Sequence, residues 1–127
     1  MSKGIQLKQG SEKVYPNSCE IKTEIEKSAG YMKDDKQVYI KRYNTGQLLN
    51  NTNKNIPTGL DFINTVELVR LEGVAINPIN GTSLPLPFPS VNANIQIAIV
   101  NNNIEIYTTS DRTAYTKSYI DLYYTKN

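Results

Sequence analysis

The sequence predicts an all-β protein, with an antiparallel β-sandwich or jelly-roll-like domain over residues 37–127 behind a short N-terminal strand or helix stalk over 1–36. Three observations predict it. Apolar residues alternate with a period of two in several segments, turn-forming residues separate those segments, and the body has no long helical period. A chain of 127 residues fits one compact domain and a short appendage.

The N-terminal part predicts a strand over 4–16 and a charged segment over 17–36. Asn17 and Glu20 have the spacing of a capping box, so a helix could begin there and end near Gly30. The alternative is a solvated linker. One helix of about three turns is marginal in water, which favours packing between copies of the chain. The expected oligomer interface consists of Val14, Tyr15, Ile21 and Ile25, with the helical stripe continued by Ser28 and Met32.

The clearest strands of the body form a hairpin. Ile95, Ile97 and Ile99 fall on one face of a strand over 94–100. After an Asn-Asn-Asn turn at 101–103, Ile104 and Ile106 continue the inward pattern. Further strands are expected at 37–43, 65–75 and 117–125, and the last has Ile120, Leu122 and Tyr124 on one face. The prolines at 85, 87 and 89 favour an extended crossing between strands over a proline-rich partner ligand.

The composition argues against several classes of function. The chain has no histidine, which removes the usual proton shuttle, Ser-His and Cys-His nucleophiles and most transition-metal sites. A net charge of +2 is too small to attract nucleic acid or acidic lipid strongly through electrostatics. A single cysteine, Cys19, and the lack of a secretory signal or spanning apolar run indicate assembly in a reducing cytoplasm without membrane insertion. We therefore expect no metal and no cofactor.

The acidic residues do not predict a catalytic pair, because they are scattered over turns and strand faces. Retaining or inverting glycosidase chemistry would need two of them to face each other across a cleft. The nine tyrosines fit core edges or subunit interfaces, and the alternative is stacking on sugars. The scattered acids are Asp34, Asp35, Asp61, Glu67, Glu72, Glu105, Asp111 and Asp121. We expect a non-enzymatic protein with no catalytic residues.

Three stretches of the sequence carry distinctive motifs: LKQGSEKVYP at 7–16, YMKDDKQVYIKR at 31–42 and TSDRTAYTKSYIDLYYTK at 109–126. These motifs resemble those of bacteriophage tail-fibre and head-fibre proteins. Residues 109–126, TSDRTAYTKSYIDLYYTK, resemble the family's T-G-S-D-R-S-x-Y-T-x-S-Y-V-T-L-E-Y-T-K tail. Residues 31–42, YMKDDKQVYIKR, resemble its W-x-D-G-K-x-(L/I)-Y-x-(R/K) opening, and residues 7–16, LKQGSEKVYP, resemble a K-x-G-x-x-x-V-Y-P strand. At 57–60 the chain reads PTGL where the family usually has A-H-G-I, so a common histidine is absent.

The resemblance implies a homotrimeric structural protein of the virion, held by its N-terminal segment to capsid, tail or baseplate proteins. Its β domain would contribute to attachment to host cell-wall glycan. The alternatives are a capsid-decoration head fibre without a receptor of its own and a carbohydrate-active enzyme. A sugar site would lie near Tyr107, Asp111, Arg112 and Tyr115. Asp111 and Arg112 could instead only form a turn that fixes the approach to the last strand.

Overall fold

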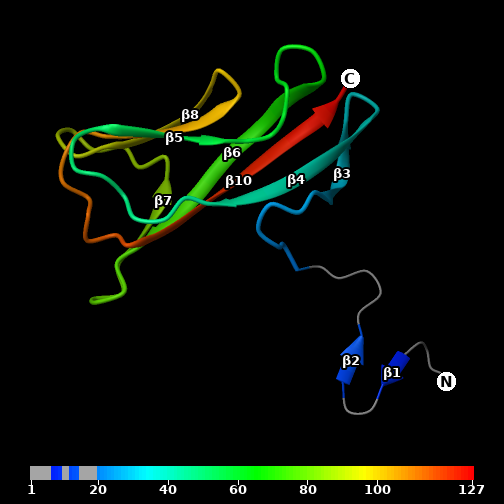
Figure 1. Ribbon diagram of the computed structural model, residues 1–127, viewed down its shortest axis with the longest axis horizontal. Helices are drawn as coiled ribbons and strands as arrows, with labels where there is room; N and C mark the ends of the chain where they lie inside the picture. The colour runs from blue at the N-terminus through cyan, green and yellow to red at the C-terminus, as the bar shows by residue number, and fades with distance from the viewer. Residues whose placement is uncertain (1–6, 10–11, 15–19) are drawn as a thin grey trace.

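The computed structural model describes residues 7–9, 12–14 and 20–127, and these residues contain strands and loops but no helix (Figure 1). Leu7–Gln9 (β1) and Glu12–Val14 (β2) pair as a small antiparallel hairpin. The remaining strands are β3 Lys27–Lys33, β4 Lys36–Asn44, β5 Asn53–Pro57, β6 Val66–Ile76, β7 Ser83–Leu86, β8 Ile95–Val100, β9 Asn103–Thr108 and β10 Lys117–Lys126.

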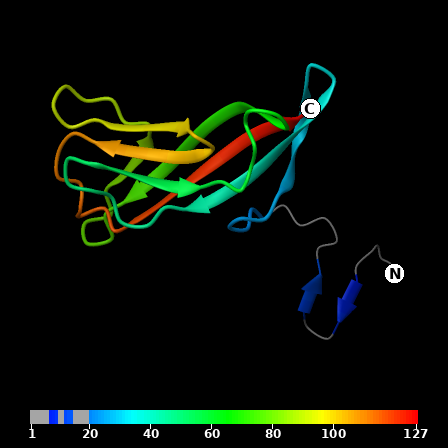
Figure 2. The same ribbon diagram turned by 45° about the horizontal axis from the view of Figure 1, so that its top comes forward.

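The body is an antiparallel β-sandwich of two sheets, which confirms the predicted fold class. The large sheet has the order β3-β4-β10-β6-β7, and the small sheet has the order β5-β9-β8. Figure 2 shows the small sheet lying across one end of the large sheet, with β4, β10 and β6 extending beyond it. The strand β10 is the centre of the large sheet, paired with β4 on one side and with β6 on the other.

The core lies between the two sheets and follows the alternation in the sequence. Ile104 and Ile106 of β9 and Ile120, Leu122 and Tyr124 of β10 are completely buried. Full burial of one such side chain contributes about 1.5–3 kcal/mol through the hydrophobic effect. The predicted strand faces of the β8–β9 hairpin and of β10 are therefore confirmed.

Two hairpins use two-residue turns with left-handed backbone. Asn101 and Asn102 have φ of 52° and 66° between β8 and β9, and Asp34 and Asp35 have φ of 51° and 64° between β3 and β4. Turns of this type match the right-handed twist of the strands, and Asn and Asp tolerate the left-handed region better than most residues. The asparagine turn is the one that the sequence predicts.

The helix considered for the segment after Asn17 is wrong within the described residues. From Lys27 the chain forms β3, which pairs with β4, and Gly30 (φ 89°) lies inside the strand at an irregular register instead of ending a helix. The physical reason is that a short helix with a narrow apolar stripe gains little alone, whereas the edge of β4 offers backbone hydrogen bonds. The β3–β4 hairpin thus crosses the expected boundary between residues 36 and 37.

The expected interface residues have different surroundings. Ile21 is partly buried and Ile25 is 57% exposed. Only the backbone of Val14 is described, in β2, and Tyr15 lies outside the described residues. Their role in an oligomer stays a prediction.

The proline segment crosses between the sheets, as the sequence favours. Pro85 lies in β7, at the edge of the large sheet, where a missing backbone N–H is tolerated. Phe88 then exchanges two backbone hydrogen bonds of 2.9 Å with Ile95, the first residue of β8 in the small sheet.

Candidate functional site

The structure brings together three of the four residues predicted for a sugar site. Asp111, Arg112 and Tyr115 lie in the loop before β10, and the Arg112 guanidinium carbon is 5.8 Å from the centre of the Tyr115 ring. Tyr107 lies on β9, with its side chain 38% exposed, opposite Asn53 and Gln96 in the ladders of the small sheet. It therefore belongs to the outer face of that sheet.

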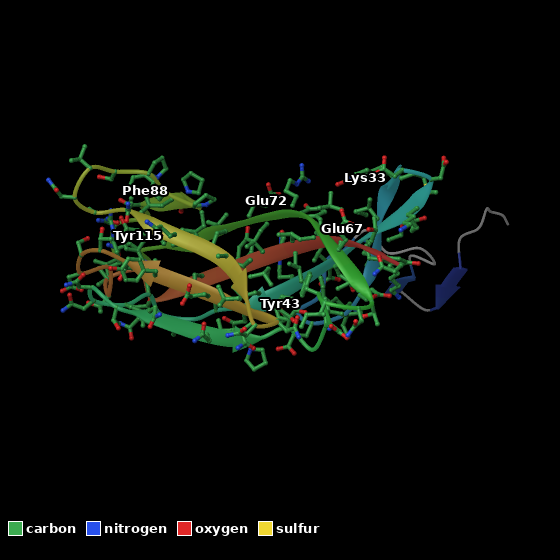
Figure 3. The ribbon with its side chains drawn as sticks, turned by 90° about the horizontal axis from the view of Figure 1, so that it is seen from above. Lys33, Tyr43, Glu67, Glu72, Phe88 and Tyr115 are labelled. Carbon is green, nitrogen blue, oxygen red and sulfur yellow. The ribbon has the colours of Figure 1, made fainter. Side chains whose placement is uncertain are left out.

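The charged groups of the loop bond mainly to the protein itself. The Arg112 guanidinium donates a hydrogen bond to the carbonyl of Ala93 and lies 5.3 Å from the centre of the Phe88 ring. The Arg112 backbone N–H donates to Leu49 at 2.9 Å. Phe88 and Tyr115 lie at the same end of the sandwich in Figure 3. Arg112 thus ties several loops together, although its Nε atom is buried without a hydrogen-bond partner among the described residues.

Asp111 stabilises the local turn. Its carboxylate accepts hydrogen bonds from the Thr113 hydroxyl at 2.7 Å and from the Thr113 backbone N–H at 3.0 Å. These bonds hold the pKa of Asp111 below its usual value. This geometry favours the turn interpretation of Asp111 and Arg112, while contact with a ligand stays a prediction.

A second polar cluster lies on the outer face of the large sheet. Because Ile120, Leu122 and Tyr124 point into the core, the alternation places Tyr119, Asp121 and Tyr123 on the opposite face of β10. The ladder sets Asp121 opposite Arg42 of β4 and Glu72 of β6. We call this the sheet-face cluster, and its members are Arg42, Arg70, Glu72, Tyr119, Asp121 and Tyr123.

Arg42 and Asp121 form a bidentate ion pair within the sheet-face cluster. Arg42 Nε and Nη2 donate to the two carboxylate oxygens of Asp121 at 2.7 and 2.9 Å. The guanidinium carbon also lies 4.0 Å from the centre of the Tyr119 ring. The hydrogen bonds with Asp121 raise the pKa of Arg42. Only 27% of the Arg42 side chain and 9% of the Asp121 side chain are exposed, so the two charges neutralise each other at a partly buried position.

A similar arrangement surrounds Tyr123. The Arg70 guanidinium carbon lies 4.2 Å from the centre of the Tyr123 ring, and the Tyr123 hydroxyl donates a hydrogen bond to the Glu72 carboxylate at 3.3 Å. Burial is the main cause that raises the pKa of Tyr123. Two tyrosine rings are therefore held by arginines along one face of β10.

The large sheet has a hollow of about 460 Å³ beside Tyr119, which we call the Tyr119 hollow. Its walls combine hydroxyl, amide and cationic groups with apolar surface, and none of its described lining residues carries a carboxylate. The lining residues that matter for its chemistry are Thr23, Arg42, Asn44, Ile76, Lys117 and Tyr119. A smaller hollow of about 260 Å³ shares Tyr119 and is lined by Glu72 and Asp121, among others. These surfaces can bind polar ligands through hydrogen bonds and ring contacts.

No local pattern in the sequence reveals the sheet-face cluster. Arg42 and Asp121 are 79 residues apart, and only the pairing of β4 with β10 brings them together. The alternation in 117–125 does indicate that Tyr119, Asp121 and Tyr123 share a face. This shared face could therefore be predicted from the sequence. The partner residues on β4 and β6 could not, because the sequence pattern does not show which strands pair with β10.

The described part of the chain contains no group of three or more His, Cys, Asp or Glu side chains that could hold a metal ion. Within the same residues, no helix is long and apolar enough to cross a membrane. No protein family, curated protein or solved structure gives a significant match to the chain.

Proposed function

We propose that the chain is a subunit of a homotrimeric bacteriophage fibre whose β-sandwich contributes to attachment to host-surface glycan without catalysis. Residues 1–36 would hold it to other virion proteins. The resemblance of residues 109–126 supports this proposal, because that stretch supplies β10 and the loop pinned by Arg112. The residues that carry the resemblance are thus residues that organise the sandwich.

The observation that supports the trimer is a set of exposed apolar side chains within the proposed anchoring segment, residues 1–36. Ile25 and Met32 are each 57% exposed, and Tyr31 is 41% exposed. Tyr31 and Met32 lie on β3, an edge strand of the large sheet, and exposed edges with apolar side chains tend to pair with other chains. Packing between copies would cover both the side chains and the edge.

A trimer also suits attachment. Three identical weak sites on one particle bind a repetitive surface far more tightly than one site, because the second and third contacts become intramolecular. The virion would then adhere to the host through many weak contacts. The cytoplasm of the infected bacterium is where such a fibre would assemble.

Light scattering of the full chain tests the oligomer. We expect a mass three times the 14.3 kDa of one chain. The double substitution Ile25→Ser and Met32→Ser should weaken the trimer, whereas Ile79→Ser and Val91→Ser should not. These control side chains are 93% and 95% exposed, and their loops are not expected at the interface. A monomer of the unchanged protein would refute the proposed trimer.

Adsorption to host cells tests attachment. The folded trimer should bind host cells and should leave their cell-wall polymers intact. A folded trimer that does not adsorb would favour a capsid-decoration fibre without a receptor. Release of sugar fragments would favour the carbohydrate-active enzyme.

A further inference from the structure

We propose that the Tyr119 hollow binds an anionic saccharide, with the sugar against Tyr119 and Ile76 and its acidic group at Lys117. This inference rests on the proposed attachment function and moves the glycan site from the loop before β10 to the outer face of the large sheet. It also assigns the class of ligand, a sugar carrying a carboxylate or a phosphate.

The hollow has the size and composition for one or two sugar rings. Its volume of about 460 Å³ lies within the range of small-molecule sites, which is about 300–1,000 Å³. Ile76 and the Tyr119 ring supply apolar surface, while Thr23, Thr116 and Asn44 supply hydroxyl and amide groups. A sugar presents C–H surface and hydroxyl groups together, so it needs both kinds of lining.

The charge of the lining selects an anion. Among the residues that the structure describes, Arg42 and Lys117 are the cationic members of the lining, and none of the lining residues is acidic. Asp121 neutralises Arg42 through two hydrogen bonds, whereas Lys117 forms no ion pair with any described residue. Lys117 is exposed and lies directly opposite Ile76 in the β10–β6 ladder. Within the described part of the chain, Lys117 is therefore a lining cation beside Ile76 that no carboxylate neutralises.

Several walls of the hollow are fixed before a ligand arrives. The bidentate bond to Asp121 holds Arg42, and Arg42 in turn packs on the Tyr119 ring at 4.0 Å. The backbone N–H of Glu24 donates to the Arg42 carbonyl at 2.6 Å, which places the neighbouring Thr23 at the rim. Rigid walls lower the entropy lost on binding.

Asn44 offers donors for the sugar hydroxyls. Its Oδ1 atom accepts a hydrogen bond of 3.0 Å from the Gly46 N–H, so the amide orientation is set by the protein. No described residue accepts a hydrogen bond from its Nδ2 group. Those N–H donors remain available to a ligand in the hollow.

The other surfaces fit an anionic sugar less well. The smaller hollow on the sheet is lined by Glu72 and Asp121, whose carboxylates repel an anion. In the loop before β10, Arg112 donates to Ala93 and Asp111 accepts from Thr113. The Tyr119 hollow combines apolar surface with Lys117, which forms no ion pair with any residue that the structure describes.

Binding of defined sugars to the full chain tests the proposal. The probes are sialyllactose and glucose 1-phosphate, with lactose and glucose as neutral counterparts, followed by NMR shifts and calorimetry. We expect the acidic probe of at least one pair to bind more tightly than its neutral counterpart, with shifts at residues 116–119 and a loss of affinity at high salt. Tighter binding of sialyllactose would show that the hollow prefers a carboxylate, and tighter binding of glucose 1-phosphate would show that it prefers a phosphate.

Variants locate the contact. Lys117→Gln should weaken binding of the acidic probe about tenfold, because it removes a charge-assisted hydrogen bond. The control Lys36→Gln makes the same change at the exposed β3–β4 turn and should bind normally. Tyr119→Leu keeps an apolar side chain but loses the ring, and it should lower affinity for both probes of the preferred pair while a circular dichroism spectrum verifies the fold.

Equal binding of acidic and neutral sugars would overturn the proposal, and so would equal losses in the two lysine variants. Adsorption to host cells that is unchanged by Lys117→Gln and by folded Tyr119→Leu would also overturn it, while leaving the proposed attachment function intact. Failure of the unchanged trimer to adsorb would instead refute the attachment function.

Discussion

Replacing Gly73 with alanine tests how closely the central strands approach. Gly73 lies in β6 opposite Ile120 of β10. A Cβ atom there would lie 2.2 Å from the Tyr119 carbonyl oxygen and 3.0 Å from Ile120 Cγ1. Reaching even 3.0 Å from the oxygen requires a shift of at least 0.8 Å, the difference between 3.0 and 2.2 Å. Because the obstacle is backbone, the two strands must separate.

The expected loss of stability follows from that separation. Overpacking costs about 1–3 kcal/mol, and weakening a ladder hydrogen bond adds about 1 kcal/mol. The lower entropy of the unfolded alanine chain offsets about 0.4–1 kcal/mol. We expect a net loss of about 2–3 kcal/mol in the free energy of unfolding, or roughly 10 °C in Tm for a domain of this size.

Urea unfolding followed by circular dichroism measures this loss. The matched control is Gly81→Ala, where no atom lies within 4 Å of the added Cβ but φ is 77°. Left-handed backbone costs alanine about 1 kcal/mol, so the control should lose clearly less. If Gly73→Ala is no more destabilising than Gly81→Ala, the inferred close approach of β6 and β10 is wrong.

Further substitutions test the core, a partly buried contact and the loop. Ile97→Asp should unfold the body, because an unpaired charge at this inward position costs several kcal/mol. Gln96→Asp, on the exposed face of the same strand, should be tolerated. Equal effects of the two substitutions in urea unfolding would refute the strand register. Burial acts to raise the pKa of Glu26, but hydrogen bonds from Lys126 at 2.7 Å and from Tyr124 outweigh it, so the net pKa lies below its usual value. The ionised Glu26 carboxylate therefore stabilises the folded state above the unfolded pKa of Glu26, and this stabilisation is lost as the pH falls through the folded pKa. We expect Tm to decline in acid and Glu26→Gln to reduce this pH dependence. Arg112→Ala should cost about 2 kcal/mol through lost loop contacts; lost host-cell adsorption at an unchanged Tm would instead support a ligand contact.

The sequence predicts the strands whose side chains alternate clearly between core and solvent. The isoleucines of β8 and β9 and the apolar face of β10 need no distant partner to be recognised, and two asparagines supply the turn. Three strands lack such a signal. β3 contains Gly30 and has mostly exposed side chains, β5 reads Asn-Lys-Asn-Ile-Pro, and β7 contains a proline. Pairing with a neighbouring strand makes these segments extended despite their weak propensity.

The same limit applies to the candidate sites. The loop residues Asp111, Arg112 and Tyr115 are close in sequence, so their proximity could be predicted. Their partners could not, because Ala93 and Phe88 approach only when the crossing segment packs against the loop. The Tyr119 hollow collects residues from 23 to 119, and its lining depends on strand order, which local periodicity does not encode.

The central position of β10 gives this chain a particular hazard during synthesis. β4 and β6 emerge from the ribosome earlier, yet both pair with β10 and not with each other. The nascent chain can form local hairpins, but its growing sheet keeps two unsatisfied edges until residues 117–126 appear. Where many copies are made close together, those exposed edges can pair with the edges of neighbouring chains. A polypeptide interrupted before β10 would therefore be an aggregation-prone fragment, and not a weakened form of the folded protein.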